Sequence, residues 1–177
     1  DALSGKEFIA VYQALEDGLK PRKVADFNRL AEAQNKLVLE QLAKGNVPEA
    51  LKKLETITVE KNGHKLEIEV LKTGMAIGDN QNSLEVPLNG HGSQAIADLL
   101  GYSLTTPWIV DQIHNESKKR GTSIPCEPQH KWAKELGLSN EKDHGNKTRT
   151  SKFLNKHQEK VDQYKQKKEI GKHTFVA

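Results

Sequence analysis

Three polar residues in the second half of the chain are the strongest candidates for chemistry. Asp111, His114 and Asn115 are spaced i, i+3 and i+4, so on a helix their side chains would project from adjacent positions on one face. A carboxylate beside an imidazole can fix the tautomer of the ring and raise its basicity, which suits a general base or a metal ligand. The alternative is a local hydrogen bond at a partly buried helix edge, because Val110 and Ile113 flank the pair.

A second histidine falls on an apolar stripe. His157 shares one face of a predicted helix with Phe153, Val161 and Tyr164, which aims it inward. A histidine in such a place is more often a hydrogen-bonded core residue than a ligand, and we expect it to be buried and hydrogen-bonded. We retain His157 beside the aspartate and histidine above as a candidate catalytic residue.

The remaining reactive groups give weaker patterns. Cys126 would be a nucleophile if His130 folded beside it, but a lone structural thiol is the preferred interpretation. Residues 143–145 (Asp-His-Gly), with Glu141, could bind a metal or substrate, yet a second histidine at ligand spacing is missing and a solvated turn is favoured. His91 lies between two glycines before a predicted helix, where it could help to bind an anion, but a turn is favoured. Cofactor and metal dependence stay open.

Charge is unevenly distributed along the chain. Residues 1–100 hold 12 Lys and Arg against 15 Asp and Glu, a net −3, whereas residues 101–177 hold 15 against 9, a net +6. Lys152, Lys156 and Lys160 form a helical stripe that could meet an anionic polymer. The alternative is a solvated face, and nucleic acid is a poor match because aromatic residues for base stacking are scarce.

The elements that position these groups begin with two helices. A Ser4-x-x-Glu7 capping box predicts a first helix that ends at Gly18. Apolar residues at helical spacing from Val24 to Leu42 predict a longer amphipathic helix, with Gly45 as its left-handed stop. A brief helix is expected after Pro48.

The periodicity then changes from helix to strand. Apolar and polar residues alternate on both sides of Asn62-Gly63, and this dipeptide favours a type I′ hairpin turn because both residues accept positive φ. Two further short strands are predicted, at residues 75–77 and 84–86. The sequence therefore predicts a small antiparallel β-sheet built on an Asn-Gly hairpin and covered by helices.

Further helices are predicted at residues 93–100, 106–119 and 151–169, so the fold class is α+β and mainly helical. Residues 121–150 form an irregular segment around one short helix. Residues 1–177 are interpreted as a single domain. The strand-like end, residues 174–177, is expected to pair within a sheet or with a downstream chain, which would make this the N-terminal portion of a longer protein.

Several stretches together resemble a group of exported bacterial proteins of unassigned activity. The most specific is Leu104-x-Thr-Pro-x-x-Val-Asp-x-Ile113. Similar stretches lie at residues 2–5, 8–9, 41–48, 76–79, 86–88, 96–98 and 153–163. The resemblance implies a secreted or periplasmic location and a chain that continues past residue 177. It also argues against Cys126 as a nucleophile, because the irregular segment of that group does not usually carry a cysteine.

Two functions follow from these observations. The first is the N-terminal portion of an exported bacterial enzyme, a hydrolase acting on an extracellular or cell-wall polymer, with Asp111, His114 and His157 in the site. The second is a noncatalytic binding module whose basic C-terminal half meets an anionic partner. A membrane span is not expected, because no run approaches the roughly 18 apolar residues that a membrane helix needs.

Overall fold

The computed structural model describes residues 1–71, 74–120 and 149–168, with side chains up to residue 163 in the last of these ranges. Several predictions from the sequence lie outside the described residues: those on Cys126, His130, Glu141, residues 143–145 and residues 174–177, and that on the Tyr164 side chain. Within the described ranges the α+β, mainly helical class is confirmed.

The first two helices form as the sequence predicts. Helix α1 (Gly5–Leu19) begins with the expected capping box, in which Ser4 Oγ accepts from the Glu7 amide and Glu7 accepts from the Ser4 amide. These hydrogen bonds from Ser4 lower the pKa of Glu7. Helix α2 (Val24–Ala43) follows, and the chain leaves it through Gly45 at φ +71°.

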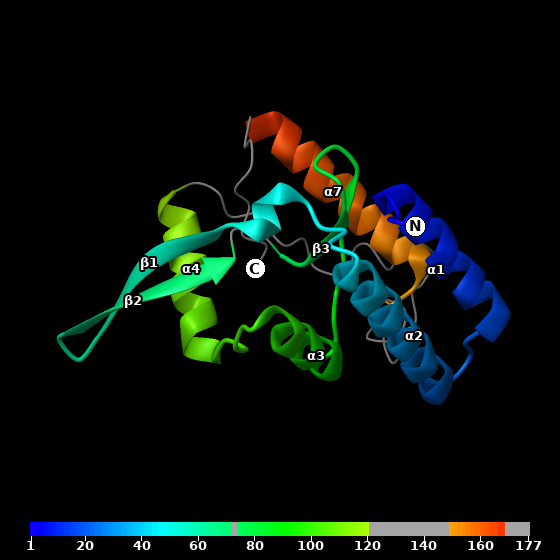
Figure 1. Ribbon diagram of the computed structural model, residues 1–177, viewed down its shortest axis with the longest axis horizontal. Helices are drawn as coiled ribbons and strands as arrows, with labels where there is room; N and C mark the ends of the chain where they lie inside the picture. Colours follow the sequence, from blue (N-terminus) through cyan, green and yellow to red (C-terminus); the bar gives the residue numbers. More distant parts are fainter. Residues whose placement is uncertain (72–73, 121–148, 169–177) are drawn as a thin grey trace.

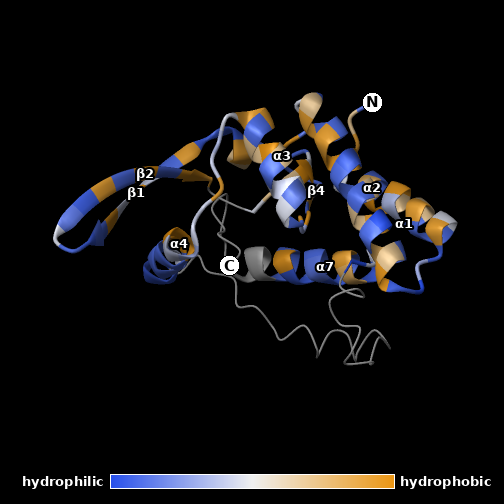
Figure 2. Ribbon diagram, turned by 90° about the horizontal axis from the view of Figure 1, so that it is seen from below, coloured by the Kyte–Doolittle hydropathy of each residue, from blue (hydrophilic) through white to orange (hydrophobic). Residues whose placement is uncertain are grey.

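The hairpin prediction is confirmed. After a 3₁₀ helix over Glu49–Lys52, strands β1 (Leu54–Lys61) and β2 (His64–Leu71) pair antiparallel. Asn62 and Gly63 have φ values of +54° and +78°, as a type I′ turn requires. The alternating hydropathy along both strands is visible in Figure 2.

The other two strands form a sheet of their own. Strands β3 (Ala76–Gly78) and β4 (Ser83–Glu85) pair antiparallel, so the described strands make two two-stranded sheets. Gly78 has φ +107°, and a side chain there would meet the Asn82 carbonyl at 2.3 Å. Glycine is required at this position because the Asn82 carbonyl also accepts from the Gly5 amide at 2.8 Å, which seats the start of α1 on this turn.

Three helices complete the described fold. They are α3 (Gly90–Leu100), α4 (Pro107–Lys119) and α7 (Ser151–Lys168). Thr106 caps α4 and Pro107 opens it, as expected. His91 differs from its prediction, because Asn89 accepts from the Gly92 amide and starts α3 early enough to place His91 in the first helical turn.

Apolar side chains gather in two separate clusters. The larger joins α1, α2, α3, β3, β4 and α7 through buried residues that include Phe8, Leu30, Ile77, Ile96 and Leu154. The smaller joins the hairpin to α4 through Ile57, Val59 and Val70, with Ile68, Trp108 and Ile113 packed against them. Figure 1 shows the corresponding arrangement, with the hairpin and α4 on one side, α1, α2 and α7 on the other, and α3 between them.

Helix α7 is fastened to α1 by polar contacts at its start. The buried Tyr12 hydroxyl donates to the Arg149 carbonyl, and Glu16 Oε2 accepts from the Ser151 amide at 2.7 Å. A carboxylate at the first amides of a helix satisfies a free donor and complements the helix dipole. In the part of the chain that is described, no helix has the length and apolar character needed to cross a membrane.

Tyr12→Phe tests this fastening. Burial raises the pKa of Tyr12 above its usual range. The variant should lose about 1 kcal/mol of unfolding free energy near neutral pH, because the Arg149 carbonyl loses its donor. Because the pKa of Tyr12 is higher in the folded protein than in the unfolded chain, the stabilisation from its protonated hydroxyl is fully present below the unfolded pKa of about 10. Above this pH the stabilisation is lost, so the difference in unfolding free energy between wild type and Tyr12→Phe should narrow as the pH rises past about 10.

Urea unfolding from about pH 7 to about pH 11 measures both effects. Tyr102→Phe is the matched control, because Tyr102 is exposed and should change stability by less than about 0.5 kcal/mol near neutral pH. Equal stability of Tyr12→Phe and wild type at neutral pH would show that the contact contributes nothing.

Candidate ligand-binding site

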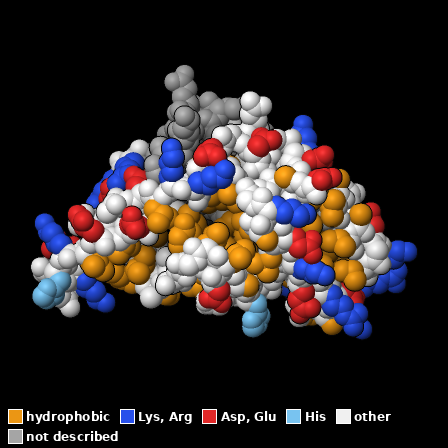
Figure 3. All heavy atoms as spheres, in the orientation of Figure 1, with side chains coloured by type: hydrophobic (Ala, Val, Ile, Leu, Met, Phe, Trp, Pro, Cys, Tyr) orange, Lys and Arg blue, Asp and Glu red, His pale blue; other side chains and the backbone are white. Residues whose placement is uncertain are grey.

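A cavity of about 710 Å³ lies between the hairpin, α3 and α4. This volume is within the range of small-molecule sites in proteins, roughly 300–1,000 Å³. Figure 3 shows this face of the molecule, where hydrophobic side chains gather across a hollow between the hairpin and the helical part. The cavity therefore occupies the space between the two apolar clusters.

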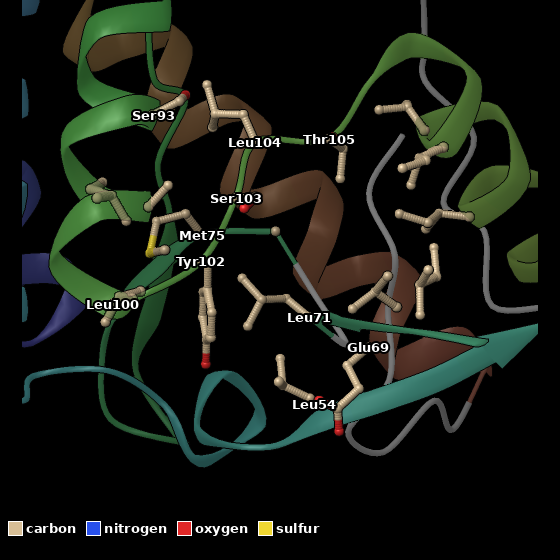
Figure 4. A pocket seen from close by; sticks show the side chains of 18 of the residues that line it. Leu54, Glu69, Leu71, Met75, Ser93, Leu100, Tyr102, Ser103, Leu104 and Thr105 are labelled. Carbon is tan, nitrogen blue, oxygen red and sulfur yellow. The ribbon is translucent and has the colours of Figure 1, made fainter. Parts of the chain in front are cut away.

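Apolar side chains from all three elements make up most of the wall. The hairpin contributes Leu54, Ile68, Val70 and Leu71, α3 contributes Ile96, Ala97 and Leu100, and α4 contributes Ile109, Val110 and Ile113. Ile96 and Leu100 on α3, and Ile109 and Ile113 on α4, are four residues apart, so each pair lies on one face of its helix. The loop between α3 and α4 adds Leu104, which is 47% exposed. Figure 4 shows Leu71 and Leu100 beside the cavity.

A few polar groups interrupt the apolar wall. They are Glu69, Ser93, Tyr102, Ser103, Thr105 and His114. Glu69 is the one residue with a full formal charge at neutral pH among the described lining residues. In Figure 4 the Tyr102 hydroxyl and the Glu69 carboxylate both point toward the lower edge of the view.

His114 is the sequence candidate that reaches this cavity. It lies on α4 and lines the wall, and its side chain is partly buried. Its Nδ1 is the single buried side-chain nitrogen or oxygen in the described residues that has no hydrogen-bond partner. A buried polar atom without a partner costs roughly 1–3 kcal/mol, and its occurrence in a folded protein requires an explanation.

Asp111 does not orient this histidine in the structure. Its side chain is exposed and is not part of the cavity wall. With His114 Nδ1 unpartnered, the carboxylate does not hold the ring by that nitrogen. Asn115 is exposed as well. The i, i+3 spacing therefore brings the residues to one helix without forming the pair that general-base chemistry would use.

His157 lies in a different environment, between α7 and β4. Phe153 and Val161 on the same stripe are buried, whereas the His157 side chain is 26% exposed. Its Nε2 is 3.7 Å from Oε2 of Glu85, whose side chain is 6% exposed. His157 therefore faces Glu85, but it is only partly buried rather than buried as expected, and its hydrogen bonding stays a prediction. It is not among the described residues that line the cavity.

Sequence reasoning missed Glu85. Its neighbours Leu84 and Val86 are apolar, so strict alternation would place Glu85 on a solvent-facing side of β4. Residues of β4 are instead buried on both faces, because α1 and α7 both contact this strand. Gln158 on α7 accepts from the Glu85 amide at 2.8 Å and donates to Asp162 at 2.8 Å, which fixes the helix against the strand.

The other proposed sites gain little support from the geometry. Among the described residues, no group of three or more His, Cys, Asp and Glu side chains is arranged to hold a metal ion. In the lysine stripe of α7, Lys152 is exposed while Lys156 and Lys160 are partly buried. The stripe is thus not a row of three equally accessible charges.

His157→Ala tests how much the contact between α7 and β4 contributes to the unfolding free energy. We expect a loss of about 1–3 kcal/mol of unfolding free energy, because the buried Glu85 carboxylate loses a partner. Asn155→Ala is the control, since Asn155 is exposed on the same helix and should cost less than about 0.5 kcal/mol. Thermal unfolding of both variants gives the comparison, and a His157→Ala midpoint equal to that of wild type would contradict a structural role.

Comparison of the chain with protein-family models, with curated proteins and with solved structures finds no match. The resemblance to exported bacterial proteins therefore stays a prediction from the sequence.

Proposed function

We propose that this domain binds a small, largely apolar molecule in the cavity between the hairpin, α3 and α4. The observation that carries the proposal is a cavity of about 710 Å³ whose wall is mostly Leu, Ile and Val with a few polar groups. Ligand sites in proteins have this composition, in which apolar walls give affinity and isolated polar groups fix orientation.

The residues at this site also leave apolar area exposed. Leu100, Leu104 and Val110 line the cavity and are 38%, 47% and 44% exposed. Burial of apolar surface is favourable by roughly 25 cal/mol per Å², so a ligand that covers these side chains gains affinity from them. Exposed apolar side chains grouped around a hollow are more typical of a binding site than apolar residues scattered singly.

The exported hydrolase remains a separate proposal that rests on the sequence. Of its three candidate residues, only His114 lines the cavity among the residues described. An enzyme would need a second group beside this histidine, and neither Asp111 nor His157 provides it as a hydrogen-bond partner. The polyanion-binding module also remains a proposal from charge distribution. Binding of an apolar ligand is the function that the described geometry supports best.

A pair of tryptophan substitutions tests the cavity. Ser103→Trp places a large side chain in the cavity wall, whereas Leu99→Trp places one at an exposed position of α3 outside that wall. With the uncharged apolar dye Nile red as the probe, we expect Ser103→Trp to weaken binding by about tenfold or more, because bulk at this position competes with the dye. Leu99→Trp should stay within about twofold of wild type.

Titration of dye fluorescence, with thermal unfolding to confirm that both variants are folded, provides the measurement. Equal weakening by both substitutions would place the dye elsewhere on the apolar surface. Absence of saturable binding to the wild-type protein would overturn the proposed function.

A further inference from the structure

The hydrogen-bonding state of His114 constrains the head group of a ligand in this cavity. Its Nδ1 is buried without a partner among the described residues, so a proton on that nitrogen would have no acceptor. An orphaned buried N–H is the rarer and more costly state, which favours the tautomer with its proton on Nε2. His114 then offers a hydrogen-bond donor from the wall of an otherwise apolar cavity.

The charges around the cavity constrain the head group further. Glu69 lines the wall, and Lys and Arg are absent from the described lining residues. Within the described part of the wall, an anionic head group would therefore meet a like charge without a compensating cation, which disfavours a carboxylate or phosphate. An uncharged head group avoids this repulsion and can still accept from Nε2 of His114.

We propose that the ligand is an uncharged amphiphile, with an apolar body that fills the cavity and a head-group oxygen that accepts a hydrogen bond from Nε2 of His114. This inference rests on the proposed function and specifies the class of ligand. An alcohol or an ester belongs to this class, whereas a fatty-acid anion does not. His114 is the residue that distinguishes such a ligand from a plain hydrocarbon.

The surroundings of the His114 ring distinguish its two nitrogens. Nδ1 is buried and no described residue offers it a hydrogen-bond partner, which leaves the proton to Nε2. A second histidine, His157, provides a contrast, because its Nε2 faces the Glu85 carboxylate. His157 therefore contacts a carboxylate of the protein, whereas His114 has no such contact among the described residues.

Paired probes of equal size test the proposal. Decanol and undecane have the same number of heavy atoms and differ in one hydroxyl, and both can be titrated against Nile red bound to the full chain. His114→Phe keeps an aromatic ring and removes both nitrogens. We expect this variant to weaken decanol about tenfold, as loss of one hydrogen bond implies, and to leave undecane within about twofold.

His114→Gln gives a second variant that does not depend on the ring. Its side-chain amide retains an N–H donor, so it should bind decanol more tightly than His114→Phe does. Glu69→Gln tests the charge argument with decanoate at low ionic strength. Because Glu69 is exposed and screened, we expect it to tighten decanoate only about two- to threefold, with decanol unchanged.

The outcomes separate this inference from the proposed function. If His114→Phe weakens decanol and undecane equally, or weakens neither, the donor role of His114 is wrong even though the cavity binds apolar molecules. If wild-type protein binds decanoate more tightly than decanol, the uncharged class is wrong. If Nile red binds saturably but no probe displaces it, the uncharged-amphiphile class is wrong, and if Nile red does not bind either, both proposals fail. Thermal unfolding of each variant confirms that folded proteins are compared.

Discussion

A two-stranded hairpin is at best marginally stable in water, so its apolar face must be covered by another element. This requirement determines where α4 lies. β1 and β2 have one apolar face, formed by Ile57, Val59 and Val70, and α4 packs against it through Trp108 and Ile113. Lys61 lies 5.2 Å from the Trp108 ring centre, and Arg120 at the end of α4 pairs with Glu55 on β1. These contacts hold α4 beside the hairpin and apart from the larger core.

The cavity is a consequence of that arrangement. Helix α3 belongs to the larger cluster through Ile96, while α4 belongs to the smaller one through Ile113, and the short loop after Gly101 joins them. Each helix has more apolar residues than its own cluster uses. The surplus side chains face a common space, and this explains why Leu100 and Val110 remain exposed.

Local signals in the sequence predict most of the fold. The Ser4 capping box, the Asn62-Gly63 turn and the Thr106-Pro107 helix start depend on neighbours within four residues, so composition and spacing suffice to identify them. The division of the strands into two sheets depends on which helix covers which strand, and no local pattern contains that information. Burial of Glu85 has the same origin, because helices from both ends of the chain enclose β4.

The candidate site shows the same division between local and distant information. Helical spacing identifies His114, but the cavity depends on residues from the hairpin, α3 and α4 that are distant in sequence. The surroundings of the two candidate histidines assign a structural role to one and a place at the ligand site to the other. His157 is matched to Glu85 and helps to fasten α7, as a structural histidine does. His114 retains a buried nitrogen that the described fold does not satisfy, and proteins rarely keep such an atom where packing alone is at stake. His114, at the wall of the cavity between the hairpin, α3 and α4, is therefore the stronger indication of where a ligand interacts with this chain.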